Sequence, residues 1–209
     1  MNKGEVRQRS RNGREKRRVF LIVCEGEKTE PIYFSHFREM LRGKASIMLK
    51  DSNVKDAVGL ARFAQTQKER LDLDTRGEDR FWIVFDADEN GQADIDRAAK
   101  ISRRAGADIA LSNPCFELWY LLHFEDHRER VDRRDTIARL RNYLPDYDKN
   151  IDCCEQLDAG QAVAIDRAKA LEERAGNQLS IGANPSTGVW RVVVGELKGL
   201  MTGIRTEPS

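Results

Sequence analysis

The segment that most constrains the fold is a short apolar run that ends abruptly in acidic residues. Residues 81–91 read FWIVFDADENG, in which five apolar residues rich in aromatic and β-branched side chains precede an acidic turn. This pattern is typical of a buried β-strand that ends at a turn. Because side chains alternate along a strand, Asp86 and Asp88 should project the same way, so that two carboxylates converge at the carboxyl end of the strand.

Two neighbouring carboxylates repel each other unless a cation lies between them. Mg²⁺ suits this position, because it is bound in proteins by one or two carboxylates together with water and substrate phosphate. The motif therefore predicts a divalent metal site for Mg²⁺ or Mn²⁺. An alternative is that Asp88 or Asn90 only caps the helix expected over residues 92–105.

The first half of the chain alternates between apolar runs and helical patterns. A second apolar run, VFLIVC at residues 19–24, ends directly before Glu25. Further strands are expected at 46–49 and 107–111, and helices at 31–42, 55–71 and 92–105. This order predicts an α/β fold, with a parallel sheet covered by helices on both faces. Ligands bind at the carboxyl ends of such strands, so Glu25, Asp86 and Asp88 share one pocket if their two strands are neighbours.

Helices dominate the pattern after residue 114, with an irregular segment expected at 145–160. The helices are expected over residues 116–124, 136–143, 162–175 and 187–201. A chain of 209 residues with 40% hydrophobic content can bury one main core and a smaller extension. We therefore expect a disordered basic arm at 1–18, an α/β core at 19–114, and a helical extension at 115–209 packed on the core.

Charge is distributed unevenly along the chain. Residues 1–18 hold eight basic and two acidic residues, a charge of 8 − 2 = +6, so the remainder carries 1 − 6 = −5. Such an arm suits the phosphate backbone of a nucleic acid, with Arg17 and Arg18 as candidate substrate-binding residues. A solvated tail is the competing interpretation.

Composition narrows the class of protein. Charged residues make up 34% of the chain, and no apolar run approaches the twenty residues of a membrane span. The four cysteines have no paired spacing of the kind that holds zinc, and no disulfide framework is suggested. We expect a soluble, cytoplasmic protein.

Several other residues are weaker candidates for the site. Glu117 lies in the apolar run CFELWYLLHF, where an unpaired carboxylate is costly to bury, so it should meet a cation, a metal or solvent. His123 lies six residues further on and faces about 120° away on a helix. Glu117, His123 and Glu89 are kept as auxiliary site candidates. A helix carboxylate paired with arginine and a hydrogen-bonded histidine at a packed edge are the structural alternatives for the first two.

Lys28 could contact a phosphate at the start of the first helix, where backbone amides favour anions. A salt bridge with Glu27 or Glu30 is the alternative. Those two acids, together with Glu25 and Glu89, would also suffice for a second metal ion. Near the end of the chain, Thr187 of the NPST sequence is expected to cap the last helix.

Four motifs in order carry a family resemblance: LIVCEGEKTEPIYF, VFDADEN, NPCFELWYLLHF and NPSTGVWRVV. Over residues 14–195 the chain resembles the RloB-like family, whose core resembles the Toprim domain of topoisomerases, primases and overcoming-lysogenisation-defect nucleases. The resemblance implies a Toprim-like parallel sheet with Glu25, Asp86 and Asp88 as catalytic residues and metal ligands. In Toprim enzymes the aspartates hold Mg²⁺, and the glutamate ligates metal or exchanges protons with the attacking or leaving oxygen.

The resemblance also implies a function. We expect a metal-dependent nuclease that cleaves DNA or RNA in anti-phage defence by abortive infection, with a partner from the same operon such as an ATPase. A non-catalytic effector that binds metal, nucleotide or nucleic acid in the same pocket is the alternative. A phosphatase of the haloacid-dehalogenase type also uses an Asp-x-Asp pair, but there the pair follows the first strand, whereas here it follows the third.

Overall fold

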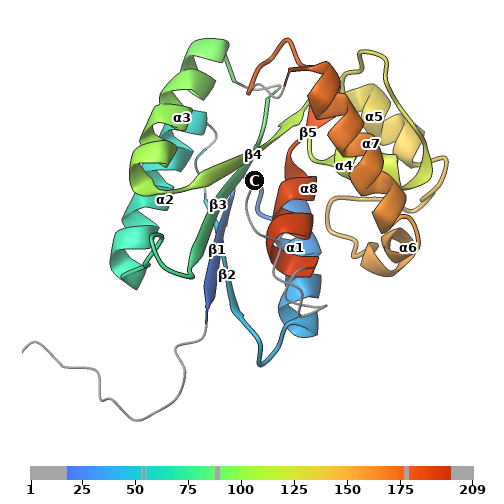
Figure 1. Ribbon diagram of the computed structural model, residues 1–209. Helices are drawn as coiled ribbons and strands as arrows, with labels where there is room; N and C mark the ends of the chain where they lie inside the picture. Colours follow the sequence, from blue (N-terminus) through green and yellow to red (C-terminus); the bar gives the residue numbers. More distant parts are fainter. Residues whose placement is uncertain (1–17, 53, 55, 88–89, 177–178, 199–209) are drawn as a thin grey trace, which may run out of the picture.

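The computed structural model describes residues 18–198, apart from 53, 55, 88–89 and 177–178. Its centre is a five-stranded sheet of order β2-β1-β3-β4-β5, in which only β5 is antiparallel to its neighbour (Figure 1). The strands are β1 (Val19–Cys24), β2 (Ser46–Asp51), β3 (Arg80–Asp86), β4 (Asp108–Asn113) and β5 (Ser186–Thr187). The predicted α/β class is confirmed, and the arrangement is consistent with a Toprim-like fold.

Helices cover both faces of this sheet (Figure 1). One face is covered by α2 (Ala57–Leu71) and α3 (Gln92–Ala105), and the other by α1 (Thr29–Met40) together with helices from the second half of the chain. Strand β1 shows why both faces are apolar: Phe20 and Ile22 pack into one core, while Leu21 and Val23 pack into the other. A strand buried on both sides has to be a continuous apolar run, which is how it was recognised in the sequence.

The second half of the chain contributes α4 (Glu117–Phe124), α5 (Arg133–Leu140), α6 (Cys154–Asp158), α7 (Gln161–Arg174), α8 (Val189–Arg191) and a π-helical segment (Val192–Lys198). Helix α5 begins earlier than the predicted 136–143, because the Asp132 side chain accepts a hydrogen bond from the Asp135 N–H at 2.8 Å and caps it. The short helix α6 interrupts the segment 145–160 that was predicted to be irregular.

The prediction of one helix over 187–201 was wrong at its start. Thr187 belongs to β5 instead, and its hydroxyl lies 2.9 Å from that of Ser112 on β4. The residue that caps α8 is Gly188, and Thr187 only accepts a weak hydrogen bond of 3.4 Å from the Val189 N–H, so its expected role as the cap was wrong. Residues 199–201 lie outside the described part of the chain.

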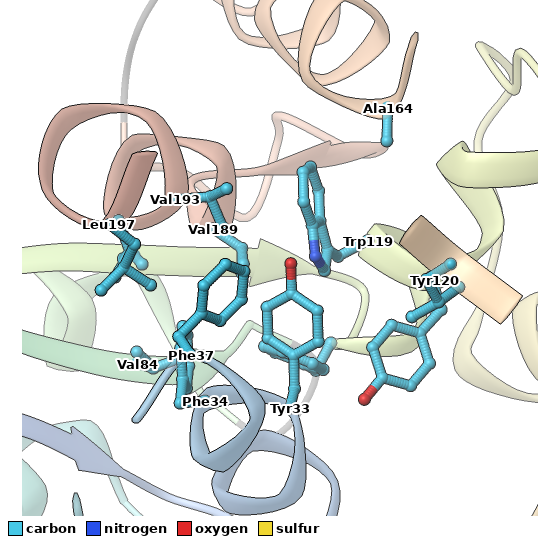
Figure 2. Packing of buried hydrophobic residues seen from close by; sticks show 14 of the residues in the cluster. Tyr33, Phe34, Phe37, Val84, Trp119, Tyr120, Ala164, Val189, Val193 and Leu197 are labelled. Carbon is cyan, nitrogen blue, oxygen red and sulfur yellow. The ribbon is translucent and has the colours of Figure 1, made fainter. Parts of the chain in front are cut away.

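The larger core is rich in aromatic side chains that join α1 to α4. Figure 2 shows Tyr33, Phe34 and Phe37 of α1 beside Trp119 of α4 and Val189 of α8. The ring of Tyr33 meets that of Trp119 edge-on, with centroids 6.3 Å apart. This packing fixes α4, and hence Glu117 at its first position, against the carboxyl end of the sheet. Across the described ranges, no helix is long and apolar enough to cross a membrane.

Phe34→Ala should lower the free energy of unfolding by about 3 to 5 kcal/mol, because it removes a fully buried ring and leaves a cavity. Met40→Ala is the matched control on the same helix, because Met40 is 44% exposed and should cost less than about 1 kcal/mol. Urea unfolding followed by circular dichroism measures both values. Equal losses in the two variants would contradict the assignment of Phe34 to the core.

Candidate functional site

Glu25 and Asp86 lie side by side at the carboxyl edge of the sheet, because β1 and β3 are parallel neighbours. The Glu25 N–H continues the ladder by donating to the Val84 carbonyl at 3.0 Å. The Glu25 carboxylate in turn accepts a hydrogen bond from the Asp86 N–H at 3.1 Å. Both residues are buried. The structure therefore brings together two acids that are 61 residues apart in the sequence.

Two more buried acids join this pair. Glu30, in the first turn of α1, folds back so that its carboxylate accepts a hydrogen bond from the Gly26 N–H at 3.2 Å. A Cβ on Gly26 would collide with that carboxylate, so glycine permits the close approach. Glu117, the first residue of α4, is 2% exposed. We refer to Glu25, Glu30, Asp86 and Glu117 as the acid cluster.

Cations and a phenol from the second half of the chain neutralise part of the acid cluster. The Arg133 guanidinium donates to the Asp86 carboxylate at 2.9 Å. The Lys149 ammonium lies 3.9 Å from the Glu117 carboxylate, which also accepts a hydrogen bond of 3.2 Å from the Tyr147 hydroxyl. The expectation that Glu117 meets a cation is thus confirmed, with lysine in place of the arginine considered above.

Two members of the acid cluster, Asp86 and Glu30, hold their protons more tightly than isolated carboxylates do. Burial, and next the nearby Glu30 carboxylate, raise the pKa of Asp86 well above its ordinary value; Glu117 and Glu25 add to this and Arg133 opposes it. Burial and the Glu117 carboxylate likewise raise the pKa of Glu30. Such a site gains from a bound cation, because the cation reduces the cost of ionising the carboxylates.

Carboxylate oxygens are suitable donors for Mg²⁺ or Mn²⁺, and Glu25 and Asp86 offer them from adjacent strands. Within the described ranges, however, no three His, Cys, Asp or Glu side chains are arranged closely enough to hold a metal ion. Asp88 and Glu89, which the sequence also nominated, lie outside the described residues. Metal binding by Glu25, Asp86 and Asp88 therefore stays a prediction.

Asn90 has a structural role that differs from the helix cap considered above. Its side-chain oxygen accepts from the Ala57 N–H at 2.8 Å, and its amide nitrogen donates to the Asp86 carbonyl at 2.9 Å. It thereby ties the start of α2 to the end of β3. The residue at the start of α3 is Gly91, whose conformation is extended.

Two of the remaining candidates, Arg18 and Lys28, form no ion pair with the acid cluster among the described residues. Arg18 precedes β1 at the opposite edge of the sheet, where it lies 3.8 Å from Glu78, and Arg17 is outside the described residues. Lys28 is exposed at the start of α1 and forms no ion pair in the described part of the chain. At the far end of α4 from Glu117, the His123 Nδ1 lies 2.8 Å from the Trp119 carbonyl oxygen, which matches the structural alternative for this histidine.

Arg133 is the most important residue that sequence reasoning missed. It lies among many charged residues, in a segment where no helix was predicted, and nothing in the sequence distinguishes it from its neighbours. Glu30 was noted as a possible salt-bridge partner of Lys28 and as one acid available for a second metal, but not as part of the site around Glu25 and Asp86. Its position in the first helical turn after Glu25 was the signal that could have placed it at the sheet edge.

Comparison with known proteins gives one match. A family model described as RloB-like protein matches residues 20–195, which is most of the chain. Neither the curated proteins nor the solved structures provide a match.

Asp86→Asn should make the metal-free protein more stable relative to wild type as the pH rises. The folded state holds the Asp86 proton more tightly than the unfolded chain, whose ordinary pKa is 3.8. The stability that protonated Asp86 contributes is therefore fully present below the unfolded-state pKa. It is lost as the pH rises through the higher pKa of the folded state. Asparagine does not ionise, so the variant does not lose this stability as the pH rises. Urea unfolding in EDTA at about pH 4.5 and about pH 7.5 measures the change.

The exposed acid Asp146 provides the control, because Asp146→Asn should shift stability little at either pH. A difference between Asp86→Asn and wild type that stays constant, or that falls with rising pH, would contradict this account of the acid cluster.

Proposed function

The chain belongs to the RloB-like protein family, and we propose that it is a metal-dependent nuclease that cleaves phosphodiester bonds in DNA or RNA. The observation that carries the proposal is the acid cluster, four buried carboxylates gathered at the carboxyl edge of a parallel sheet. Ligands of α/β sheets bind at this edge. Buried carboxylates with raised pKa values are also typical of functional sites.

Cleavage of a phosphodiester needs the charge on the phosphoryl oxygens to be neutralised and a water molecule to be activated. A Mg²⁺ or Mn²⁺ ion supplies both when it is bound by carboxylates. Glu25 and Asp86 would hold the ion through their carboxylate oxygens, with Asp88 as the third ligand expected from the sequence. The Asp86 N–H orients the Glu25 carboxylate, and Asn90 fixes the backbone of Asp86.

Arg133 supports a substrate with phosphate groups. Its guanidinium lies 2.9 Å from Asp86, so it places a positive charge directly beside the acids that would hold the ion. Guanidinium groups bind phosphate oxygens with two hydrogen bonds in favourable geometry. In the absence of a bound ion, the same charge lowers the cost of burying the Asp86 carboxylate.

Family membership extends the proposal to biological context. We propose that the protein acts in the cytoplasm in anti-phage defence by abortive infection, together with a partner such as an ATPase from the same operon. The basic arm at residues 1–18 would add electrostatic attraction for nucleic acid. Of this arm, only Arg18 is described, and it lies at the opposite edge of the sheet from the acids.

A second candidate is a non-catalytic effector that binds metal, nucleotide or nucleic acid in the same pocket. It is favoured by the arginine that is already paired with Asp86, because Arg133 compensates the charge of this carboxylate without a metal ion. Toxicity to an infected cell would then arise through a partner protein.

Glu25→Gln and Asp86→Asn should each reduce Mg²⁺- or Mn²⁺-dependent cleavage by at least about a hundredfold, because each removes a negative charge from the proposed metal site. Labelled single-stranded and duplex DNA and RNA, resolved on denaturing gels, measure the rates. Glu155→Gln removes the same charge from an exposed position on α6 and should leave the rates unchanged.

Undiminished cleavage by both variants, with folding retained, would end the nuclease proposal. Metal binding by calorimetry that depends on Glu25 and Asp86, without turnover of any of the four substrates, would instead favour the effector.

A further inference from the structure

A pocket of about 670 Å³ opens beside the acid cluster. Ala87 and Asn90, which follow Asp86 on the chain, line one side, and the segment that leads into α5 lines the other. Arg133 connects the pocket to the site, because it lines the pocket and its guanidinium contacts Asp86. The pocket therefore adjoins the acid cluster on the side of Arg133.

The floor of the pocket is held by a set of amide hydrogen bonds. The Asn184 amide nitrogen donates to Asn113 at 3.0 Å and to the Val131 carbonyl at 2.9 Å, while its oxygen accepts from the Val131 N–H at 2.9 Å. Asn113 also donates to the carbonyls of Ser180 and Ile181. These bonds fix the segment before α5 to the end of β4. The backbone next to Arg130 is therefore held in place.

The charge around the pocket favours an anion. Its lining contains Arg130, Arg133 and Arg134 against two acids, a balance of 3 − 2 = +1. One of those acids, Asp132, is already engaged as the cap of α5. Arg130 and Arg134 are exposed and form no hydrogen bond or ion pair with the described residues. Two guanidinium groups are thus available beside a third that faces the acid cluster.

We propose that this pocket binds the nucleotide next to the scissile phosphate of a single-stranded nucleic acid, with Arg130 and Arg134 contacting its backbone phosphates. This inference rests on the proposed function. The volume lies in the range of roughly 300 to 1,000 Å³ that is usual for small-ligand sites. A base inside a duplex is stacked and paired, and reaches such a pocket only after it has been extruded, whereas a base in a single strand enters without that cost.

Binding can be measured separately from cleavage by working in EDTA. The probe is a fluorescein-labelled single strand of about 12 nucleotides, as DNA and as RNA, followed by anisotropy with the full chain. The double variant Arg130→Gln/Arg134→Gln should bind about tenfold more weakly. Its affinity should also depend less on salt, with the log–log slope reduced by about 1.4, because two phosphate contacts at roughly 0.7 each are lost.

The double variant Arg103→Gln/Arg104→Gln is the matched control. Arg103 and Arg104 are exposed in the last turn of α3, which begins after β3 and ends before β4, so they lie towards the opposite edge of the sheet. Their loss removes the same two charges from a position away from the pocket and should leave the affinity within about twofold. All variants keep residues 1–18, so any contribution of the basic arm is the same in each.

Wild-type affinity in the double variant, or tighter binding of the matched duplex than of the single strand, would overturn the inference. Its failure is distinguishable from that of the proposed function. If cleavage depends on Glu25 while binding is insensitive to Arg130 and Arg134, only the pocket assignment fails. If binding depends on both arginines and no substrate is ever cleaved, the nuclease proposal fails and the pocket stands only as a binding site for single-stranded nucleic acid.

Discussion

The parallel pairing of β1 with β3 is the constraint on which the site depends. It places Glu25 next to Asp86, and the hydrogen bond from the Asp86 backbone to the Glu25 carboxylate fixes their relative position. A change of one residue in this register would turn the strand side chains to the opposite face and separate the two acids. The cores on both faces of the sheet oppose such a change, because each alternate residue of β1 is packed into one of them.

The acid cluster has an energetic consequence for the whole chain. Four buried carboxylates oppose folding unless protons, cations or hydrogen bonds compensate for the lost water. Backbone amides supply part of this compensation, at Gly26 and at Asp86. Further compensation comes from Arg133, Tyr147 and Lys149, which all lie after the α/β core in the sequence.

The sequence predicted those features that depend on local pattern. Helix α3 was predicted over its observed range, which the structure bounds with Gly91 and Gly106. Strand β1 was predicted because its run is wholly apolar. The proximity of Glu25 and Asp86 followed from a general property of parallel sheets. Arg133 could not be predicted, because it meets Asp86 across 47 residues and only tertiary packing selects it from the many arginines nearby. Strand β5 has two residues, too few to form a recognisable pattern.

The pairing of Arg133 with Asp86 joins the two halves of the chain into one electrostatic unit. The helical half supplies a counter-charge that the sheet half needs in order to bury its aspartate, so neither half presents the same site alone. The helical half therefore cannot be replaced without changing the site on the sheet. Substitutions near the start of α5 therefore alter the environment of a carboxylate on β3, and the two segments are constrained to change together.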